Sequence, residues 1–114
     1  MSTTIEKITC VTIDFETYNG QPLYKALLEV AGGTNVLQAT ATKGLGIVNK
    51  DTEFTNNSAF KNPPHPIFVH VIGTEEDSAA FLKKAAPMVK NHVVLREKLE
   101  LFSNESTPSL SVAI

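Results

Sequence analysis

The sequence predicts an α+β domain in which two helices cover one face of a four-stranded antiparallel sheet. The chain has 114 residues, which suits a single domain. Its periodic segments follow the order strand, helix, strand, long loop, strand, helix, strand. Because crossover connections are right-handed, this order gives a split βαβ arrangement, the ferredoxin-like βαββαβ sandwich. We expect residues 1–102 to form the domain and the Ser-rich residues 103–114 to form a C-terminal tail.

The strands are expected at residues 5–15, 36–43, 67–72 and 93–102, where β-branched and other apolar residues concentrate. The first and third of these segments carry apolar residues at both alternating positions. A strand with one wet face would alternate more cleanly, so both are expected in the centre of the sheet. In the last strand Glu97 interrupts the apolar side, and the sequence alone offers no reason for it.

Both helices have recognisable ends. The first is expected at residues 21–31, with Pro22 in the first turn, where its missing N–H costs nothing, and with Gly32 as the stop. Thr74 is expected to cap the second helix, because its hydroxyl can accept a free N–H and acidic residues follow it. Pro87 should kink or end that helix.

Composition excludes several classes of protein. Lys and Arg number 10 against 12 Asp and Glu, and Arg96 is the only arginine, which argues against nucleic-acid binding. No run of 18 apolar residues occurs, so membrane insertion is not expected. The start of the chain lacks the blocks of a signal peptide, and the lone Cys10 cannot form an internal disulfide. We therefore expect a cytoplasmic location and a buried, inert thiol.

One sheet face should remain uncovered by the helices. The sequence does not fix which alternating set of the central strands points there: Ile8 and Cys10 or their neighbours, with Phe68, His70 and Ile72 or theirs. Either set exposes more apolar area than a soluble monomer normally shows. We therefore expect this face to pack on other copies of the chain, with a closed ring as the economical solution.

Four local strings resemble the small PII-like signalling proteins. Residues 20–28 (GQPLYKALL) resemble their first helix, and residues 40–46 (TATKGLG) resemble the end of their second strand. Residues 66–76 resemble their third strand and acidic helix start, and residues 93–100 resemble their closing strand. The similarity covers about residues 5–102, and the order of the strings is more specific than any one of them.

This resemblance implies a homotrimer of ferredoxin-like subunits that binds an adenine nucleotide, ADP or ATP, in the clefts between subunits. It also implies a T-loop between the second and third strands, at about residues 47–65, that contacts a target such as a transporter or an enzyme. Proteins of this family are regulators and not catalysts, so no catalytic residue or catalytic cofactor is expected.

The same resemblance assigns nucleotide contacts to four places in the chain. They are Leu37 and Gln38 on the second strand, Thr42, Lys43, Gly44, Leu45 and Gly46 at its end, Val71 and Ile72 on the third strand, and Lys90, Asn91 and His92 in the turn before the last strand. Glycine N–H groups can approach a phosphate closely, and the lysines add positive charge. The aliphatic members would flank the base. A glycine pair of this kind is, by itself, more typical of a plain turn; together with the resemblance the two interpretations carry equal weight.

The sequence also departs from the family. Ile47 stands where the family has an arginine, and residues 103–106 replace its basic C-terminal segment. Two phosphate contacts are therefore missing. Binding is expected to be weaker, to favour fewer phosphates, or to use other lysines such as Lys50 or Lys61.

Other functions fit less well. The three histidines, at positions 65, 70 and 92, are far apart and have no metal-ligand spacing, so no metal site is expected. No nucleophile with a neighbouring base can be assembled, which disfavours an enzyme. The alternative is an oligomer of the same fold that senses another small ligand or a divalent metal, similar to ACT modules or CutA proteins.

Overall fold

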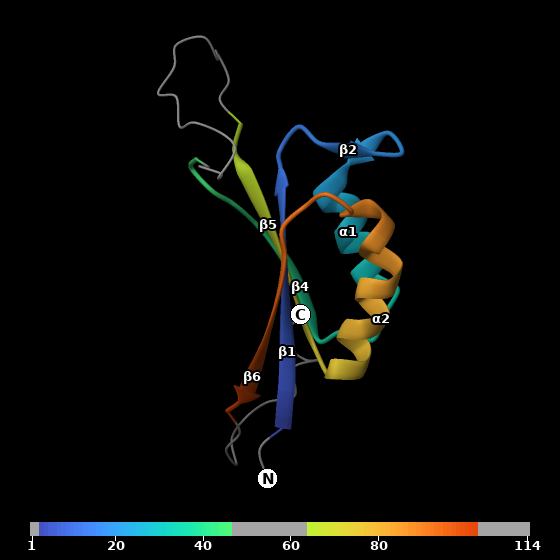
Figure 1. Ribbon diagram of the computed structural model, residues 1–114, viewed down its shortest axis with the longest axis vertical. Coiled ribbons are helices and arrows are strands. Elements are labelled where there is room, and N and C mark those ends of the chain that lie inside the picture. The colour runs from blue at the N-terminus through green and yellow to red at the C-terminus, as the bar shows by residue number, and fades with distance from the viewer. Residues whose placement is uncertain (1–2, 47–63, 103–114) are drawn as a thin grey trace.

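A computed structural model describes residues 3–46 and 64–102 (Figure 1). Its strands form one sheet in the order β4-β5-β1-β6, and every neighbouring pair is antiparallel. The predicted α+β sandwich with two central strands is therefore confirmed. The elements are β1 (Thr3–Ile13), β2 (Thr17–Tyr18), β3 (Gln21–Pro22), α1 (Leu23–Gly32), β4 (Gln38–Lys43), β5 (Pro66–Gly73), α2 (Glu75–Ala85), a 3-10 turn (Ala86–Met88) and β6 (Val94–Leu101).

The hydrophobic core lies between the sheet and the two helices, which both cover the same face (Figure 1). Ile8 of β1 lies opposite Val71 of β5, and both are fully buried under α1 and α2. Cys10 belongs to the same set, and burial raises the pKa of its thiol to about 11. The thiol therefore stays protonated at neutral pH and is a poor nucleophile, as expected.

A two-stranded hairpin, β2–β3, precedes α1 and was not predicted. Asn19 and Gly20 form its turn with φ values of 51° and 84°, a left-handed pair that glycine and asparagine adopt most readily. The predicted first helix is confirmed, but it begins at Leu23 because Pro22 pairs with Thr17 in this hairpin. The hairpin fixes the connection between β1 and α1.

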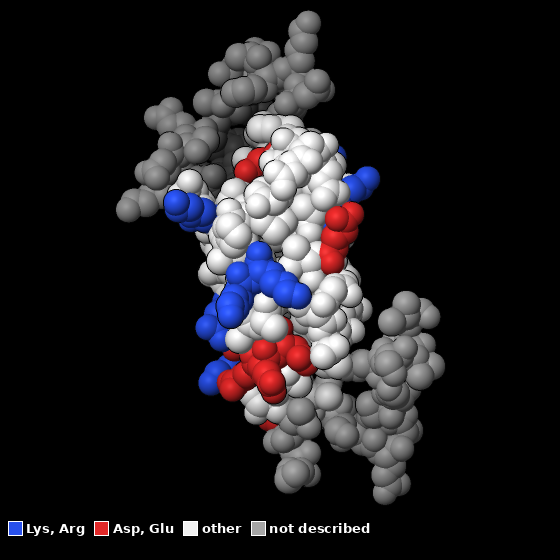
Figure 2. Space-filling model, turned by 90° about the vertical axis from the view of Figure 1, so that its right-hand side faces the viewer, with Lys and Arg blue, Asp and Glu red and all other residues white. Residues whose placement is uncertain are grey.

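Helix α2 has the predicted ends. The Thr74 hydroxyl accepts the Asp77 N–H at 3.1 Å, and three acidic residues occupy the first turn. The helix ends at Ala85, and Pro87 lies in the 3-10 turn that follows. Figure 2 shows the side of the molecule that carries the helices, with acidic side chains gathered near one end and basic side chains beyond them. In α2 the acidic residues occupy the first turn and two lysines the last turn, which suits the helix dipole.

The structure decides which residues face the uncovered side of the sheet. Because Ile8 and Cys10 point to the helices, their neighbours point away, and so do Phe68, His70 and Ile72 of β5. The side chains on this side are a mixture of apolar residues and polar ones such as Lys7, Thr9 and Glu97, and Leu95 of β6 is 57% exposed. We call this surface the open face; its apolar members are Ile5, Val11, Ile13, Phe68, Ile72, Leu95, Leu99 and Leu101.

Glu97 has a partner that the sequence did not indicate. It lies opposite Lys7 in the β1–β6 pair, and the two side chains form an ion pair at 3.9 Å. The charge that interrupts the apolar side of β6 is thus balanced across the strands. Within the described ranges, no helix is long and apolar enough to cross a membrane. Most of the predicted T-loop (47–63) and the tail (103–114) lie outside the described residues.

Candidate functional site

The candidate site lies at the end of the sheet where β1 and β4 finish and β5 and β6 start (upper end in Figure 1). Two backbone hydrogen bonds hold this end together. The Gly44 N–H donates to the Pro66 carbonyl at 2.8 Å, and the Asp14 N–H donates to the His65 carbonyl at 2.9 Å. The two chain segments that flank residues 47–63 are thereby tied side by side.

Gly44 is required by close approach of the chain. A Cβ atom at this position would lie 2.7 Å from Cγ of Pro66 and 3.2 Å from Cε2 of Phe68. The proline ring is rigid, so a side chain at position 44 would displace backbone. At Gly46, by contrast, a Cβ would meet no atom of the described residues within 4 Å. Packing therefore requires a glycine at position 44, whereas position 46 has room for a side chain.

Asp14, at the end of β1, contacts both of these flanking segments. Its Oδ2 lies 3.7 Å from Nζ of Lys43 and 3.5 Å from Nδ1 of His65. The Asp14 side chain is 29% exposed and the Lys43 side chain 58%. The lysine proposed to supply phosphate charge therefore already has a carboxylate partner.

A second carboxylate–histidine pair lies beside the first. Nε2 of His92 is 2.6 Å from Oε2 of Glu16, whose Oε1 accepts the Ile13 N–H at 2.8 Å. This contact ties the turn after β1 to the start of β6, so His92 is engaged within the chain. Lys90 and Asn91, next to it, are exposed.

The structure divides the predicted nucleotide residues into separate groups. Gln38 lies opposite Ile72, and the Leu37 N–H donates to the Ile72 carbonyl at 2.7 Å. These three lie together at the far end of the sheet, and Gln38 is about 17 Å from Lys43 along β4 at about 3.4 Å per residue. The other residues predicted on this segment lie together at the upper end of β4: Thr42, Lys43, Gly44, Leu45 and Gly46. The side chain of Leu45 is 96% exposed there.

Val71 has to be removed from the candidate site. Its side chain is fully buried in the core, between the sheet and the helices, and cannot flank a base. The error has a simple physical cause. Both alternating sets of β5 are largely apolar, so the sequence did not show which set faces the helices.

Lys43 and Lys90 lie at the same end of the sheet but at its two opposite edges. Lys43 ends the edge strand β4, whereas Lys90 precedes the other edge strand, β6. Two central strands separate them, with neighbouring strands about 4.8 Å apart. A ligand that contacted both lysines of one chain would have to span the width of the sheet.

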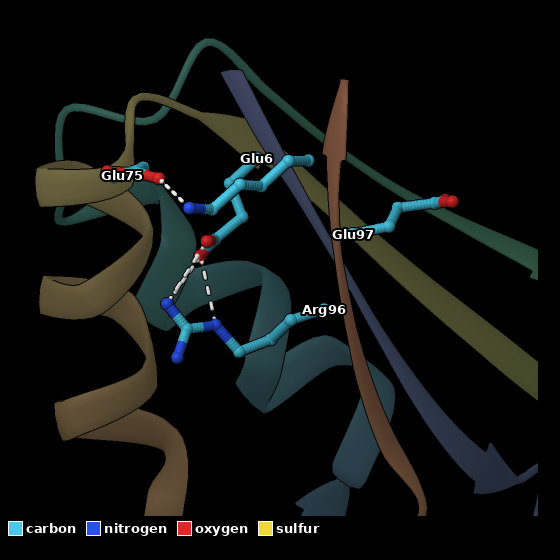
Figure 3. Close-up of a pocket in the computed structure, with 5 residues that line it drawn as sticks. Glu6, Glu75, Arg96 and Glu97 are labelled. Carbon is cyan, nitrogen blue, oxygen red and sulfur yellow. Dashed lines mark hydrogen bonds and ion pairs between the residues drawn. The ribbon is translucent and has the colours of Figure 1, made fainter. Parts of the chain in front are cut away.

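A groove at the opposite end of the sheet was missed by the sequence (Figure 3). It is an open groove of about 490 Å³ lined by Glu6, Glu75, Arg96, Glu97 and Lys98. Arg96 donates three hydrogen bonds of 3.0–3.1 Å to the buried carboxylate of Glu6. Lys98 lies 2.9 Å from Glu75, and their hydrogen bond lowers the pKa of Glu75 and raises the pKa of Lys98.

The charges of this groove are largely balanced internally. Both cations have a carboxylate partner, and Glu97 extends on the other side of β6 (Figure 3). The contacts of these two cations, 2.9–3.1 Å long, are shorter than the 3.7 Å between Lys43 and Asp14, so a phosphate displaces their carboxylates less easily and the groove is a weaker ligand site than the Gly44 end. The alternation of residues along β1 could have revealed the Glu6–Arg96 pair, because Glu6 lies on the same side of the strand as Ile8 and Cys10.

We expect Arg96→Met to destabilise the fold by about 1 to 2 kcal/mol, because it leaves the buried Glu6 carboxylate without its hydrogen bonds. Lys98→Met is the matched control on the same strand, since its pair with Glu75 is exposed and such pairs contribute little. Urea unfolding followed by circular dichroism measures both variants. Equal stability of the two variants would show that Glu6 does not depend on Arg96.

The described ranges hold no group of three or more His, Cys, Asp and Glu side chains placed to bind a metal ion. The histidines are engaged separately. His65 contacts Asp14, His92 contacts Glu16, and Nδ1 of His70 lies 3.1 Å from the Thr9 hydroxyl.

Comparison with known proteins identifies the family. The model of the DUF190 family, described as "Uncharacterized ACR, COG1993", matches residues 6–101. No curated protein matches the sequence at a significant level.

Solved structures of low sequence identity share the fold. CPII from Thiomonas intermedia K12, bound to ADP, AMP and acetate, has a TM-score of 0.62 at 13% identity, covering 90% of this chain and 93% of CPII. CPII bound to ADP and bicarbonate gives 0.58 at 14%, covering 89% and 91%. A protein described as a putative PII-like signalling protein, from Thermus thermophilus, gives 0.54 at 14%, covering 88% and 89%. The chain therefore belongs to the DUF190 family and has the ferredoxin-like fold of PII-like proteins.

Proposed function

We propose that the protein is a PII-like regulator that binds an adenine nucleotide between the subunits of a homotrimer and controls a target protein through residues 47–65. One observation carries the proposal. The candidate ligand residues lie at opposite edges of the sheet, beside the open face, so packing of subunits through this face would bring residues of different chains together. The fold shared with ADP-bound CPII supports adenine nucleotides as the ligand class.

The open face supplies the surface for assembly. Burying its apolar side chains between subunits contributes about 25 cal/mol per Å² of apolar area. His70 lies within this face, stacked near Phe68 with ring centroids 6.3 Å apart. Burial, and then the charge of Lys7, lowers the pKa of His70. A neutral imidazole at neutral pH suits a contact surface that excludes water.

The nucleotide site uses the end of β4. The Gly44 N–H is already donated to the Pro66 carbonyl, so the backbone N–H of Gly46 is the one that approaches the phosphates, and Lys43 with Lys90 of a neighbouring subunit supply positive charge. Leu37, Gln38 and Ile72 remain the proposed contacts of the base, with Thr42, Leu45 and Asn91 beside the phosphates. His92 acts indirectly, since its Nε2 holds Glu16.

The protein would act by conformational coupling and not by catalysis. A nucleotide can shift the conformation of the segment after Gly46 only as far as its affinities for the two conformations differ. The target would be a transporter or an enzyme in the cytoplasm that recognises one of the two conformations.

Isothermal titration with AMP, ADP and ATP tests the proposal. We expect one nucleotide per subunit and an affinity for ADP that Lys43→Ala weakens about tenfold, while Lys25→Ala, an exposed change on α1, leaves it unchanged. A Lys43→Ala protein that binds ADP as tightly as the wild type would contradict the role of Lys43. If only an amino acid or a divalent metal raises the thermal stability, the protein is a sensor of that ligand instead.

A further inference from the structure

Asp14 occupies a position that the proposed binding of nucleotide does not explain. It is a carboxylate placed beside the lysine that should attract a phosphate, with Oδ2 3.7 Å from Lys43 Nζ. The same Oδ2 is 3.5 Å from His65 Nδ1, and the Asp14 N–H donates to the His65 carbonyl. The carboxylate thus contacts Lys43, the last residue of β4, and His65, which directly precedes β5.

A phosphate at Lys43 competes with Asp14 for the same ammonium group. The lysine side chain is 58% exposed and flexible, so its ammonium group can turn from one anion to another at low cost. When it turns, the His65 backbone N–H still donates to Asp14 Oδ1 at 3.5 Å and the His65 ring still lies 3.5 Å from Oδ2, so the carboxylate is not left without contacts. The geometry therefore contains two alternative pairings of one lysine.

We propose that Asp14 is a positioning residue that competes with the ligand phosphates for Lys43 and thereby sets the affinity and the phosphate preference of the site. This inference rests on the proposed nucleotide function. A carboxylate a few Å from Lys43 opposes ligands in proportion to their negative charge, so its effect is larger for ADP than for AMP. It keeps the unliganded lysine at the end of β4 against β1, and a bound phosphate breaks that contact.

Asp14→Asn tests this competition, because the amide keeps the shape and a hydrogen-bonding capacity while removing the charge. By titration calorimetry we expect ADP binding to tighten about three- to tenfold, with a smaller gain for AMP and with gains that shrink as salt is raised. Asp14→Glu retains the charge on a longer side chain, so we expect it to gain much less affinity than Asp14→Asn. Thermal unfolding without ligand separates this effect from a purely structural role, which would lower stability without raising affinity.

A double-mutant cycle with Lys43→Gln shows whether Asp14 acts through the lysine. In the Lys43→Gln background we expect Asp14→Asn to change ADP affinity by less than about twofold. An equal gain in both backgrounds, or no gain with wild-type Lys43, would overturn the competition while leaving nucleotide binding in place. If no variant binds ADP, the proposed function itself fails, and that result is distinct from an Asp14-independent affinity.

Discussion

Leu95→Lys should separate the protein into single chains while leaving the fold of each chain intact. Leu95 is 57% exposed on edge strand β6, so in the isolated chain a lysine there reaches water easily. In an assembly that covers the open face, the same lysine would replace a buried leucine, whose burial contributes about 1.5 to 3 kcal/mol. The loss recurs in every subunit, and an unpaired buried charge adds several kcal/mol more.

The matched control is Glu100→Lys, which also introduces lysine on β6 but on the side away from the open face. Sedimentation velocity measures the mass of both variants, and circular dichroism checks that both are folded. We expect a monomer for Leu95→Lys and the wild-type mass for Glu100→Lys. If Leu95→Lys keeps the wild-type mass, the open face is not the contact between subunits.

Gly44→Val should destabilise the fold and abolish nucleotide binding together. The added Cβ meets the Pro66 ring at 2.7 Å and Phe68 at 3.2 Å, and a rigid ring cannot turn aside as a flexible side chain would. Forcing atoms into packed space costs typically about 1 to 3 kcal/mol, and β-branching places this change near the upper end. The shift of backbone also breaks the Gly44–Pro66 hydrogen bond that ties β4 to β5.

Thermal unfolding measures the effect, with Gly46→Val as the control for stability. We expect the melting temperature to fall by about 10 °C for Gly44→Val and by much less for Gly46→Val, because position 46 meets no described atom within 4 Å. Equal melting temperatures would show that the close approach at Gly44 is relieved without cost. In that case steric fit could not explain the glycine at position 44.

Much of the fold was predictable because local signals agreed with each other. The Thr74 cap, the acidic first turn and Pro87 indicated both ends of α2, and the structure confirms them. Strands β1 and β5 were placed at the centre because both carry apolar residues at both alternating positions, and the strand order confirms it. The hairpin β2–β3 was not predicted, because strands of two residues are too short to show an alternating pattern of apolar and polar residues.

The candidate site was less predictable, because its contacts join residues far apart in the sequence. Glu16 and His92 are 76 residues apart, and no local pattern links them. The same holds for Asp14 with Lys43 and for Glu6 with Arg96. Val71 was misplaced because the sequence does not show which alternating set of residues in a strand faces the helices. Only the packing of the helices on one face of the sheet decides this.

The open faces of several subunits should cover one another, with nucleotide bound where the subunits meet. Native mass spectrometry of the wild-type protein with ADP tests both parts in one spectrum. We expect a species of three times the 12.4 kDa chain mass that carries up to one ADP per subunit. A single chain, with or without ADP, would contradict this assembly, because the residues on opposite edges of the sheet would then never meet.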